Sequence, residues 1–377
     1  MLNSLNIKNY RNLKDLKIQS LGRVNLITGK NNTGKSTILE AIALYASKGD
    51  LALIYQFLTE RGENFSQNEN NKNAVDANIR SLSSLFTNRQ IGFEKEDAII
   101  IGTLENTLFG EDYLSESSLA IRFVKYSDET QRDNQGITFI RKRTLIEVNG
   151  NEELNNYKVG LEIRLGLSYN IIPIEDYKPY RYNFRGIGLN ESYQFIRTRN
   201  IDKEINGNLF DNITLTEKEQ FIIDALKIIE PTTERIAFIG ESSRERTAVI
   251  KLANVPNPLP LRSMGDGVNR ILTIILALVN SDNGFLLIDE FENGLHHTVQ
   301  EKLWNVIFKL AESLKIQVFV TTHSEDCIVG FENILNNPTH QLDGKLIRLD
   351  NIGGKIKQVE FSAEELRIAT DQNIETR

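Results

Sequence analysis

Apolar residues along the chain alternate between compact runs and runs with helical spacing. The compact runs lie at 24–27, 284–289 and 316–321, and they indicate strands that are buried on both faces. Apolar residues three and four positions apart predict helices at 35–46, 268–279, 299–314 and 325–336. Strands that alternate with helices form parallel sheets covered on both sides, so the sequence predicts an α/β unit.

The stretch between residues 51 and 234 has a different texture. Residues 64–73 are polar and rich in asparagine, which predicts an exposed loop. Strand-like segments follow at 98–101, 119–124, 137–148 and 159–167, and a helix is predicted at 215–229. We therefore expect residues 1–50 and 235–377 to form the α/β unit, and residues 51–234 to form an inserted α+β region.

Composition suits an ordinary globular protein and excludes several classes. Of the 377 residues, 40% are hydrophobic and 25% are charged. The single cysteine, Cys327, excludes an internal disulfide framework and a cysteine-based zinc or iron–sulfur site. The longest nearly apolar run, 271–279, is far shorter than the ~20 residues of a membrane span, and the N-terminus lacks the apolar core of a signal peptide. We expect a cytoplasmic protein that does not contact a membrane.

The charge balance bears on nucleic-acid binding. A formal net charge of −7 argues against a protein whose whole surface binds nucleic acid, but it leaves a local basic groove open. Basic and aromatic residues interleave at 177–186, 141–143 is a short basic run, and Arg197 and Arg199 follow. Such segments can contact phosphates and stack on bases, so DNA or RNA is a candidate partner. The pattern slightly favours the alternative, a strand pair with one solvated face and one aromatic core face.

A phosphate-binding motif lies between the first compact run and the first predicted helix. Residues 29–36 read GKNNTGKS, which is G-x-x-x-x-G-K-[ST] in the strand–loop–helix context that the motif requires. Gly29 and Gly34 allow a tight turn, Lys35 offers a positive charge to the β- and γ-phosphates, and Ser36 can bind Mg²⁺. We expect nucleotide contacts from Gly29, Lys30, Asn31, Asn32, Thr33, Gly34, Lys35, Ser36 and Thr37.

Three further segments offer chemistry around that loop. The strand FLLIDE ends in Asp289, a candidate Mg²⁺ ligand, and Glu290, a candidate general base. The next strand ends at His323, which can hydrogen-bond a γ-phosphate. The turn SMGDG precedes an apolar helix, and its Ser263 and Gly265 form a second anion-binding turn that would act on the nucleotide of a partner subunit. Alone, each segment also fits an ordinary solvated strand end, a capping histidine or an N-capped helix.

The order of these four segments resembles that of ABC-type ATPase heads of the SMC, RecF and OLD class. In the terms of that class, GKNNTGKS is Walker A, FLLIDE is Walker B, SMGDG stands at the signature motif and VTTHS carries the switch histidine. The opening LNIKNYRNLKDLKI and the segment FENGLHH are similar to those of RecF and OLD proteins, and the chain is close to stand-alone bacterial "AAA family ATP/GTP-binding proteins". It departs from the signature at Met264 and Asp266, and Gln90 is a candidate for the Q-loop glutamine.

The resemblance implies a P-loop NTPase fold and an ATPase that hydrolyses ATP to ADP and phosphate with Mg²⁺. In that reading Lys35 binds phosphates, Ser36 and Asp289 hold the metal, Glu290 activates water and His323 senses the γ-phosphate. It also implies a homodimer with ATP between two heads, and a role in DNA repair or defence against phage. The stretch after His323 contains no D-x-D triplet, so a nuclease or Toprim activity would belong to a partner protein.

Two other classes stay open. One is the nucleotide-binding subunit of a transporter, which the long insertion and the RecF-like N-terminal strand argue against. The other is a non-catalytic, nucleotide-dependent scaffold, which the presence of Glu290 argues against. The base-contacting residues are not identifiable from the sequence, so GTP is an alternative to ATP.

Overall fold

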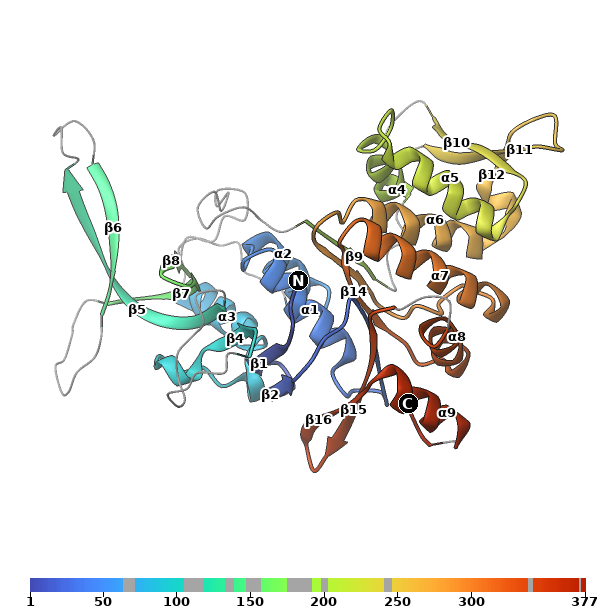
Figure 1. Ribbon diagram of the computed structural model, residues 1–377. Helices are drawn as coiled ribbons and strands as arrows, with labels where there is room; N and C mark the ends of the chain where they lie inside the picture. The colour runs from blue at the N-terminus through green and yellow to red at the C-terminus, as the bar shows by residue number, and fades with distance from the viewer. Residues whose placement is uncertain are drawn as a thin grey trace. The chain divides into compact units, whose positions relative to one another are not determined.

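The computed structural model describes residues 1–63, 72–104, 118–132, 139–146, 157–174, 192–197, 203–240, 246–337, 342–372 and 374–377 (Figure 1). Contacts divide the chain into two compact units. The first unit consists of Met1–Asn3, Ile18–Leu39 and Glu191–Arg377, and the second consists of Ser4–Lys17 and Glu40–Asn190. The sequence analysis expects the units to divide after residue 50 and before residue 235. The boundaries in the structure differ from these because of how the strands pair.

The first unit is built on a six-stranded sheet. Its strands lie in the order β16 (Lys355–Phe361), β15 (Gly344–Ile352), β3 (Val24–Gly29), β14 (Gln317–Thr321), β13 (Phe285–Ile288) and β9 (Tyr193–Ile196). All neighbours are parallel except β16, which pairs antiparallel with β15. Every residue of β3, β13 and β14 is buried, as expected for strands covered on both faces. Because β9 pairs with β13, it belongs to this unit although it precedes residue 235.

Helices of the first unit cover this sheet. The helices α6 (Asp266–Val279), α7 (His297–Ser313) and α8 (Glu325–Leu335) lie side by side, with α9 (Ala363–Asp371) next to α8 (Figure 1). Their apolar side chains and those of the strands form one hydrophobic core. At its centre, the fully buried Trp304 stacks on Phe291 with ring centroids 4.4 Å apart. Its indole N–H donates to the main-chain oxygen of Cys327 at 3.2 Å, so the polar atom of this large side chain is also paired.

A small antiparallel sheet precedes α6. It consists of β10 (Thr233–Ile239), β11 (Thr247–Leu252) and β12 (Leu259–Pro260). The chain passes from β12 into the 3₁₀ turn Leu261–Met264 and then into α6. The turn packs on β11 and β12, so the start of α6 is tied to this sheet. Two further helices, α4 (Lys203–Asp211) and α5 (Lys218–Ile229), pack on α6.

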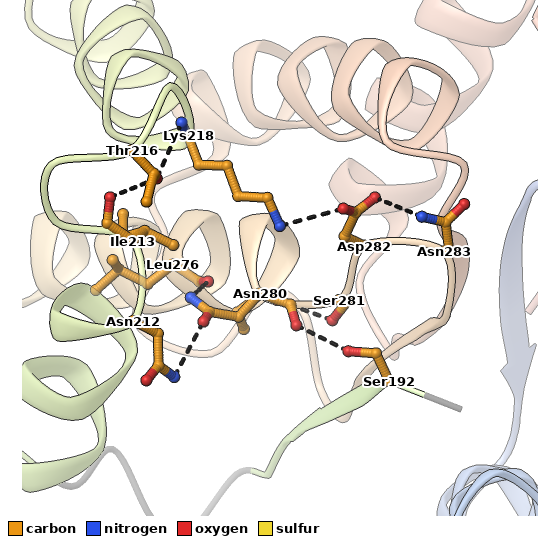
Figure 2. Close-up of polar contacts among 11 residues, drawn as sticks. Ser192, Asn212, Ile213, Thr216, Lys218, Leu276, Asn280, Ser281, Asp282 and Asn283 are labelled. Carbon is orange, nitrogen blue, oxygen red and sulfur yellow. Dashed lines mark hydrogen bonds and ion pairs between the residues drawn. The ribbon is translucent and has the colours of Figure 1, made fainter. Parts of the chain in front are cut away.

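A polar junction holds the other end of α6 (Figure 2). The side chain of Asn280 donates to the main-chain oxygens of Leu276 at 2.8 Å and Leu209 at 3.0 Å. It accepts a hydrogen bond from the amide of Asn212 at 3.3 Å, and Ser192 donates to its main-chain oxygen at 3.0 Å. These bonds satisfy carbonyl groups that a helix leaves unpaired at its C-terminus. The end of α6 is therefore attached both to α4 and to the residue that precedes β9.

The second unit contains an antiparallel sheet. Its strands lie in the order β2 (Leu13–Ile18), β1 (Leu5–Tyr10), β4 (Ile99–Gly102), β5 (Leu119–Arg132), β7 (Lys158–Leu165) and β8 (Ser168–Pro173), and β6 (Phe139–Leu145) pairs with β5. Because β1 pairs with β4, the N-terminal strands belong to this sheet rather than to the sheet of the first unit. The other elements are α2 (Leu51–Thr59), α3 (Lys72–Ser83) and the 3₁₀ turns Thr87–Arg89 and Lys95–Asp97. Helix α1 (Lys35–Ala46) begins in the first unit and continues in the second.

Some sequence predictions fall outside the described residues. They are most of the loop at 64–73, the basic and aromatic segment at 177–186, and Arg199. The predicted helices and strands of the α/β unit are confirmed to within a few residues at each end. In the part of the chain that the structure describes, no helix is both long enough and apolar enough to span a membrane.

Candidate functional site

The loop at 29–36 joins β3 to α1, as the motif requires. The backbone takes positive φ angles at Gly29 (135°), Asn32 (63°) and Gly34 (93°), a region that glycine adopts most readily. A Cβ at Gly29 would lie only 2.5 Å from the main-chain oxygen of Leu349, so glycine allows β15 to pass close to the loop. Main-chain N–H groups and the positive end of α1 together make this loop suitable for an anion.

Lys35 is the first residue of α1 and is 6% exposed. Its ammonium group donates to the main-chain oxygens of Gly29 at 2.6 Å and Lys30 at 3.0 Å, so it lies against the start of the loop. Burial lowers the pKa of Lys35 to about 8, and nearby carboxylates, Asp289 foremost, oppose that shift. A bound phosphate would give this buried charge a direct partner and would raise the pKa again.

The carboxylate of Asp289 meets hydroxyl groups from two other elements. Ser36, in the first turn of α1, donates to its Oδ1 at 3.0 Å, and Thr321, at the end of β14, donates to the same atom at 2.7 Å. A serine hydroxyl beside a carboxylate fits Mg²⁺, which prefers oxygen ligands and keeps waters and phosphate oxygens as the rest of its shell. Among the described residues, no group of three or more His, Cys, Asp or Glu could hold a metal. One hydroxyl and one carboxylate leave most positions around a Mg²⁺ ion to waters and phosphate oxygens.

Glu290 has an unusual backbone conformation. Its φ is 51°, which is uncommon for any residue other than glycine. Its N–H donates to Thr321 Oγ1 at 2.9 Å, and its main-chain oxygen accepts from Arg270 at 3.3 Å. The residue as a whole is partly exposed. Backbone strain that is maintained by surrounding contacts is a recurrent feature of functional sites.

Glu292 holds the segment that carries His323. One of its carboxylate oxygens accepts from the main-chain N–H of His323 at 2.7 Å, and the other accepts from the hydroxyl of Thr322 at 2.7 Å. Burial lowers the pKa of His323 below its ordinary value, and the charge of Lys35 acts in the same direction. The imidazole is therefore mainly neutral at pH 7, and a neutral imidazole can still donate one hydrogen bond to a phosphate oxygen.

Ser263 and Gly265 lie in the exposed turn before α6. The hydroxyl of Ser263 donates to the main-chain oxygen of Pro260 at 2.7 Å, and the N–H of Gly265 donates to the main-chain oxygen of Arg262 at 3.2 Å. Gly265 has a φ of 102°, and the space where its Cβ would lie is open. The hydrogen bonds of both residues thus stay within the turn, and the turn presents the positive end of α6 to solvent.

The last residues of the chain lie beside the start of the loop. The hydroxyl of Thr28 donates to the main-chain oxygen of Thr376 at 2.6 Å, and Lys30 pairs with Glu375 at 3.7 Å. Arg377 pairs with Glu325 at 3.3 Å. These contacts place residues 375–377 beside the C-terminal end of β3 and the start of α8.

Arg270, Thr321 and Glu292 belong to the site although the sequence analysis does not single them out. Thr321 and Glu292 stand inside the quoted segments VTTHS and FENGLHH, next to the residues that motif matching selects. Arg270 leaves a clearer signal, since it is the one charged residue in the apolar stretch 268–279. A charged side chain inside an apolar helix has to find partners, and here they are main-chain oxygens of the site.

The remaining candidates lie elsewhere. Gln90 is exposed and belongs to the second unit. Arg143, also in that unit, donates to the main-chain oxygen of Ile171 at 2.9 Å. Arg197 lies over the ring of Phe195 at 4.7 Å in the first unit. Arg143 and Arg197 thus make contacts within the protein, whereas the segment at 177–186 lies outside the described residues.

Comparison with known proteins gives matches over most of the chain. Residues 1–328 match the family described as "AAA ATPase domain". A Helicobacter pylori protein named "ATP/GTP phosphatase" is 25% identical over 365 residues, which cover 93% of this chain and 92% of that protein. A "DNA replication and repair protein RecF" from Rickettsia typhi is 48% identical over 44 residues, 12% of each chain. The crystal structure of an SMC head bound to the C-winged helix domain of ScpA aligns with a TM-score of 0.49 at 13% identity, over 97% of this chain and 99% of that one.

Proposed function

The chain belongs to the AAA ATPase domain family, and we propose that it is a P-loop NTPase that binds ATP with Mg²⁺ and hydrolyses it to ADP and phosphate. The observation that carries the proposal is the 3.0 Å contact between Ser36 Oγ and Asp289 Oδ1. It joins the phosphate loop to the acidic strand end across 253 residues of sequence. Bound Mg²⁺ would be held by these two residues and would neutralise charge on the phosphates.

The chain's own groups would bind the triphosphate. Main-chain N–H groups of residues 29–37 would donate to phosphate oxygens, and Lys35 would exchange its two carbonyl partners for the β- and γ-phosphates. Each hydrogen bond to a charged group contributes about 1.5–3 kcal/mol. Several such bonds converging on one ligand are sufficient for micromolar affinity.

Two residues would act on the γ-phosphate. The carboxylate of Glu290, a partly exposed residue, would accept a proton from the attacking water. His323 would donate a hydrogen bond to a γ-phosphate oxygen, and Glu292 would keep its segment in place. A neutral histidine suits this role, because it can donate a hydrogen bond to the γ-phosphate without carrying a charge of its own.

A second copy of the chain would complete each site. Ser263 and Gly265 are exposed at the positive end of α6, and their own hydrogen bonds remain inside the turn. In a homodimer with ATP between the two heads, this turn would contact the γ-phosphate bound by the partner. ATP would then hold two copies together, and hydrolysis would release them.

Nucleotide binding and turnover test the first part of the proposal. Lys35→Ala should abolish ATP binding, measured by titration with a fluorescent ATP analogue, whereas the exposed Lys309→Ala on α7 should bind ATP like the wild type. Normal affinity in Lys35→Ala would refute the assignment of the loop. GTP belongs in the same assay, because the H. pylori relative is named for both nucleotides.

Glutamate and serine variants test the catalytic and dimer parts. Glu290→Gln should bind ATP, turn over very slowly and accumulate as a dimer in light scattering. Rapid turnover would remove Glu290 from the role of base, and binding without turnover in the wild type would favour the scaffold alternative.

Ser263→Arg should keep ATP binding and lose turnover, with Ser313→Arg, at an exposed position on α7, as control. Turnover in Ser263→Arg equal to that of the control would refute the dimer.

The biological part of the proposal is a role in DNA repair or phage defence with a partner effector, such as a nuclease or Toprim protein. The short match to RecF supports it. Double-stranded DNA or RNA should then raise the rate of ATP hydrolysis, in a manner that added salt weakens. Unchanged hydrolysis with either nucleic acid would remove them as direct partners of this chain.

A further inference from the structure

Helix α6 contains one buried charge that the proposed chemistry does not use. Arg270 is 1% exposed and lies among apolar residues at 268–279. A buried guanidinium is unfavourable unless its N–H groups are paired, so its partners indicate its role.

The partners of Arg270 are main-chain oxygens at the ends of neighbouring strands. Its Nη2 donates to the main-chain oxygen of Asp289 at 3.1 Å and to that of Glu290 at 3.3 Å. Its Nη1 reaches the main-chain oxygen of Arg197, just after β9, at 3.5 Å. The guanidinium is a flat fork with donors in fixed directions, which a lysine ammonium cannot reproduce.

The first two of these acceptors, the carbonyl groups of Asp289 and Glu290, flank the Cα of Glu290. The carbonyl of Asp289 belongs to the peptide group before the Glu290 Cα, and the carbonyl of Glu290 belongs to the peptide group after it. One side chain therefore holds both peptide planes whose rotation defines φ and ψ at this residue. Together with the bond from the N–H of Glu290 to Thr321 Oγ1, these contacts maintain the left-handed φ of 51° at Glu290. A return to right-handed φ would turn the Cβ, and the carboxylate would point elsewhere.

The turn that contains Ser263 and Gly265 lies at the N-terminus of the same helix. Gly265 directly precedes α6, and Arg270 follows it by about 7–8 Å along the helix axis. The far end of α6 is attached at Asn280 through the junction with α4 (Figure 2). The C-terminus of α6 is fixed in this way. A displacement of the segment at Ser263 and Gly265 will therefore move the side chains of the first residues of α6.

We propose that Arg270 is a positioning residue that sets the direction of the Glu290 carboxylate and links it to the turn at Ser263 and Gly265. Contact between that turn and a partner's nucleotide then acts on Glu290 through α6, so that hydrolysis follows assembly of the two heads. The inference rests on the proposed ATP hydrolysis and adds the route by which the second copy controls it.

The first experiment separates positioning from stability. Arg270→Lys keeps the charge and loses the fork, so we expect an about 10²-fold fall in kcat with ATP affinity near that of the wild type. The control is Thr273→Val, because Thr273 is also buried on α6 but contacts Asn206 of α4 at 2.9 Å. It should lower the melting temperature by a similar amount and leave kcat unchanged. An Arg270→Lys protein that turns over as fast as Thr273→Val would overturn the proposal.

A double-mutant cycle tests whether Arg270 acts through Glu290. In single-turnover reactions, Arg270→Lys combined with Glu290→Gln should be as slow as Glu290→Gln alone, because there is no longer a carboxylate to position. If Arg270→Lys costs the same factor with and without the Glu290 carboxylate, the effect does not pass through Glu290, and the inference fails.

Dimer formation tests the link to the turn. The double variant should still form the ATP-dependent dimer that Glu290→Gln forms, since the turn itself is intact. Loss of that dimer would show that Arg270 is needed for the structure of the turn itself, and would overturn the proposed link from the turn to Glu290. The two proposals fail differently: absent turnover in the wild type rejects the proposed function, whereas wild-type turnover with normal kcat in Arg270→Lys rejects only this inference.

Discussion

Replacing Gly29 by alanine should destabilise the protein through two separate effects. The added Cβ would lie 2.5 Å from the main-chain oxygen of Leu349 and 2.9 Å from Thr33 Oγ1, which is well inside van der Waals contact. The first neighbour cannot move cheaply, because Leu349 is paired with Gly29 in the register of β15 and β3. Overpacking of this kind costs about 1–3 kcal/mol. The φ of 135° adds backbone strain of about 1–3 kcal/mol.

Gly353→Ala is the matched control for that prediction. Gly353 also has a positive φ, 60°, but nothing lies within 4 Å of the position of its Cβ. Alanine at this site should cost only backbone strain, about 1–2 kcal/mol. Urea denaturation should therefore show a further loss of about 1–3 kcal/mol in the free energy of unfolding for Gly29→Ala, together with weaker ATP binding. Equal losses in the two variants would mean that β15 yields to the methyl group, and would refute the reasoning.

Other predictions concern the site itself. Lys35 has a pKa of about 8, so ATP affinity should be nearly constant below pH 7.5 and fall about tenfold per unit well above pH 8, as the charged form disappears. Calorimetry at pH 8 in two buffers should show uptake of about half a proton on binding, and no uptake would contradict the assigned pKa. Thr321→Val removes the donor to Asp289 and leaves the N–H of Glu290 unpaired, so urea denaturation should show a free energy of unfolding lower by about 2–4 kcal/mol. Wild-type stability in this variant would exclude a structural role for the two hydrogen bonds of Thr321. Glu292→Ala releases the segment of His323, so steady-state kinetics should show an about tenfold lower kcat at similar ATP affinity; an unchanged kcat would separate that segment from catalysis.

Local patterns predict the elements of the first unit well, whereas pairing between distant strands leaves no local trace. The helix at 35–46 agrees with α1 at both ends, since loop residues precede it and its apolar spacing is regular. Strand β9 reads YQFI and lacks the continuous apolar run that predicts the equally short β13. It joins the sheet through pairing with β13. Strand β1 reads as an ordinary strand, and only its pairing with β4 assigns it to the second unit.

The site shows the same division between local and distant information. Motif matching selects Ser36 and Asp289, and the structure places their oxygen atoms 3.0 Å apart, as two elements of one parallel sheet edge should. The roles given to these residues stay predictions until they are measured. Arg270 is harder to find, because its significance comes from carbonyl groups that lie on another segment and carry no residue-specific signal.

The lone thiol of the chain has a practical consequence. Cys327 is fully buried, and burial raises its pKa far above the ordinary value. Alkylating reagents attack the thiolate, so the native polypeptide should behave almost as though it had no cysteine. A single cysteine introduced at an exposed position can then be labelled selectively without first removing Cys327. Spectroscopic probes at such positions would thus test whether two copies of the chain meet and part, while the core around Trp304 stays intact.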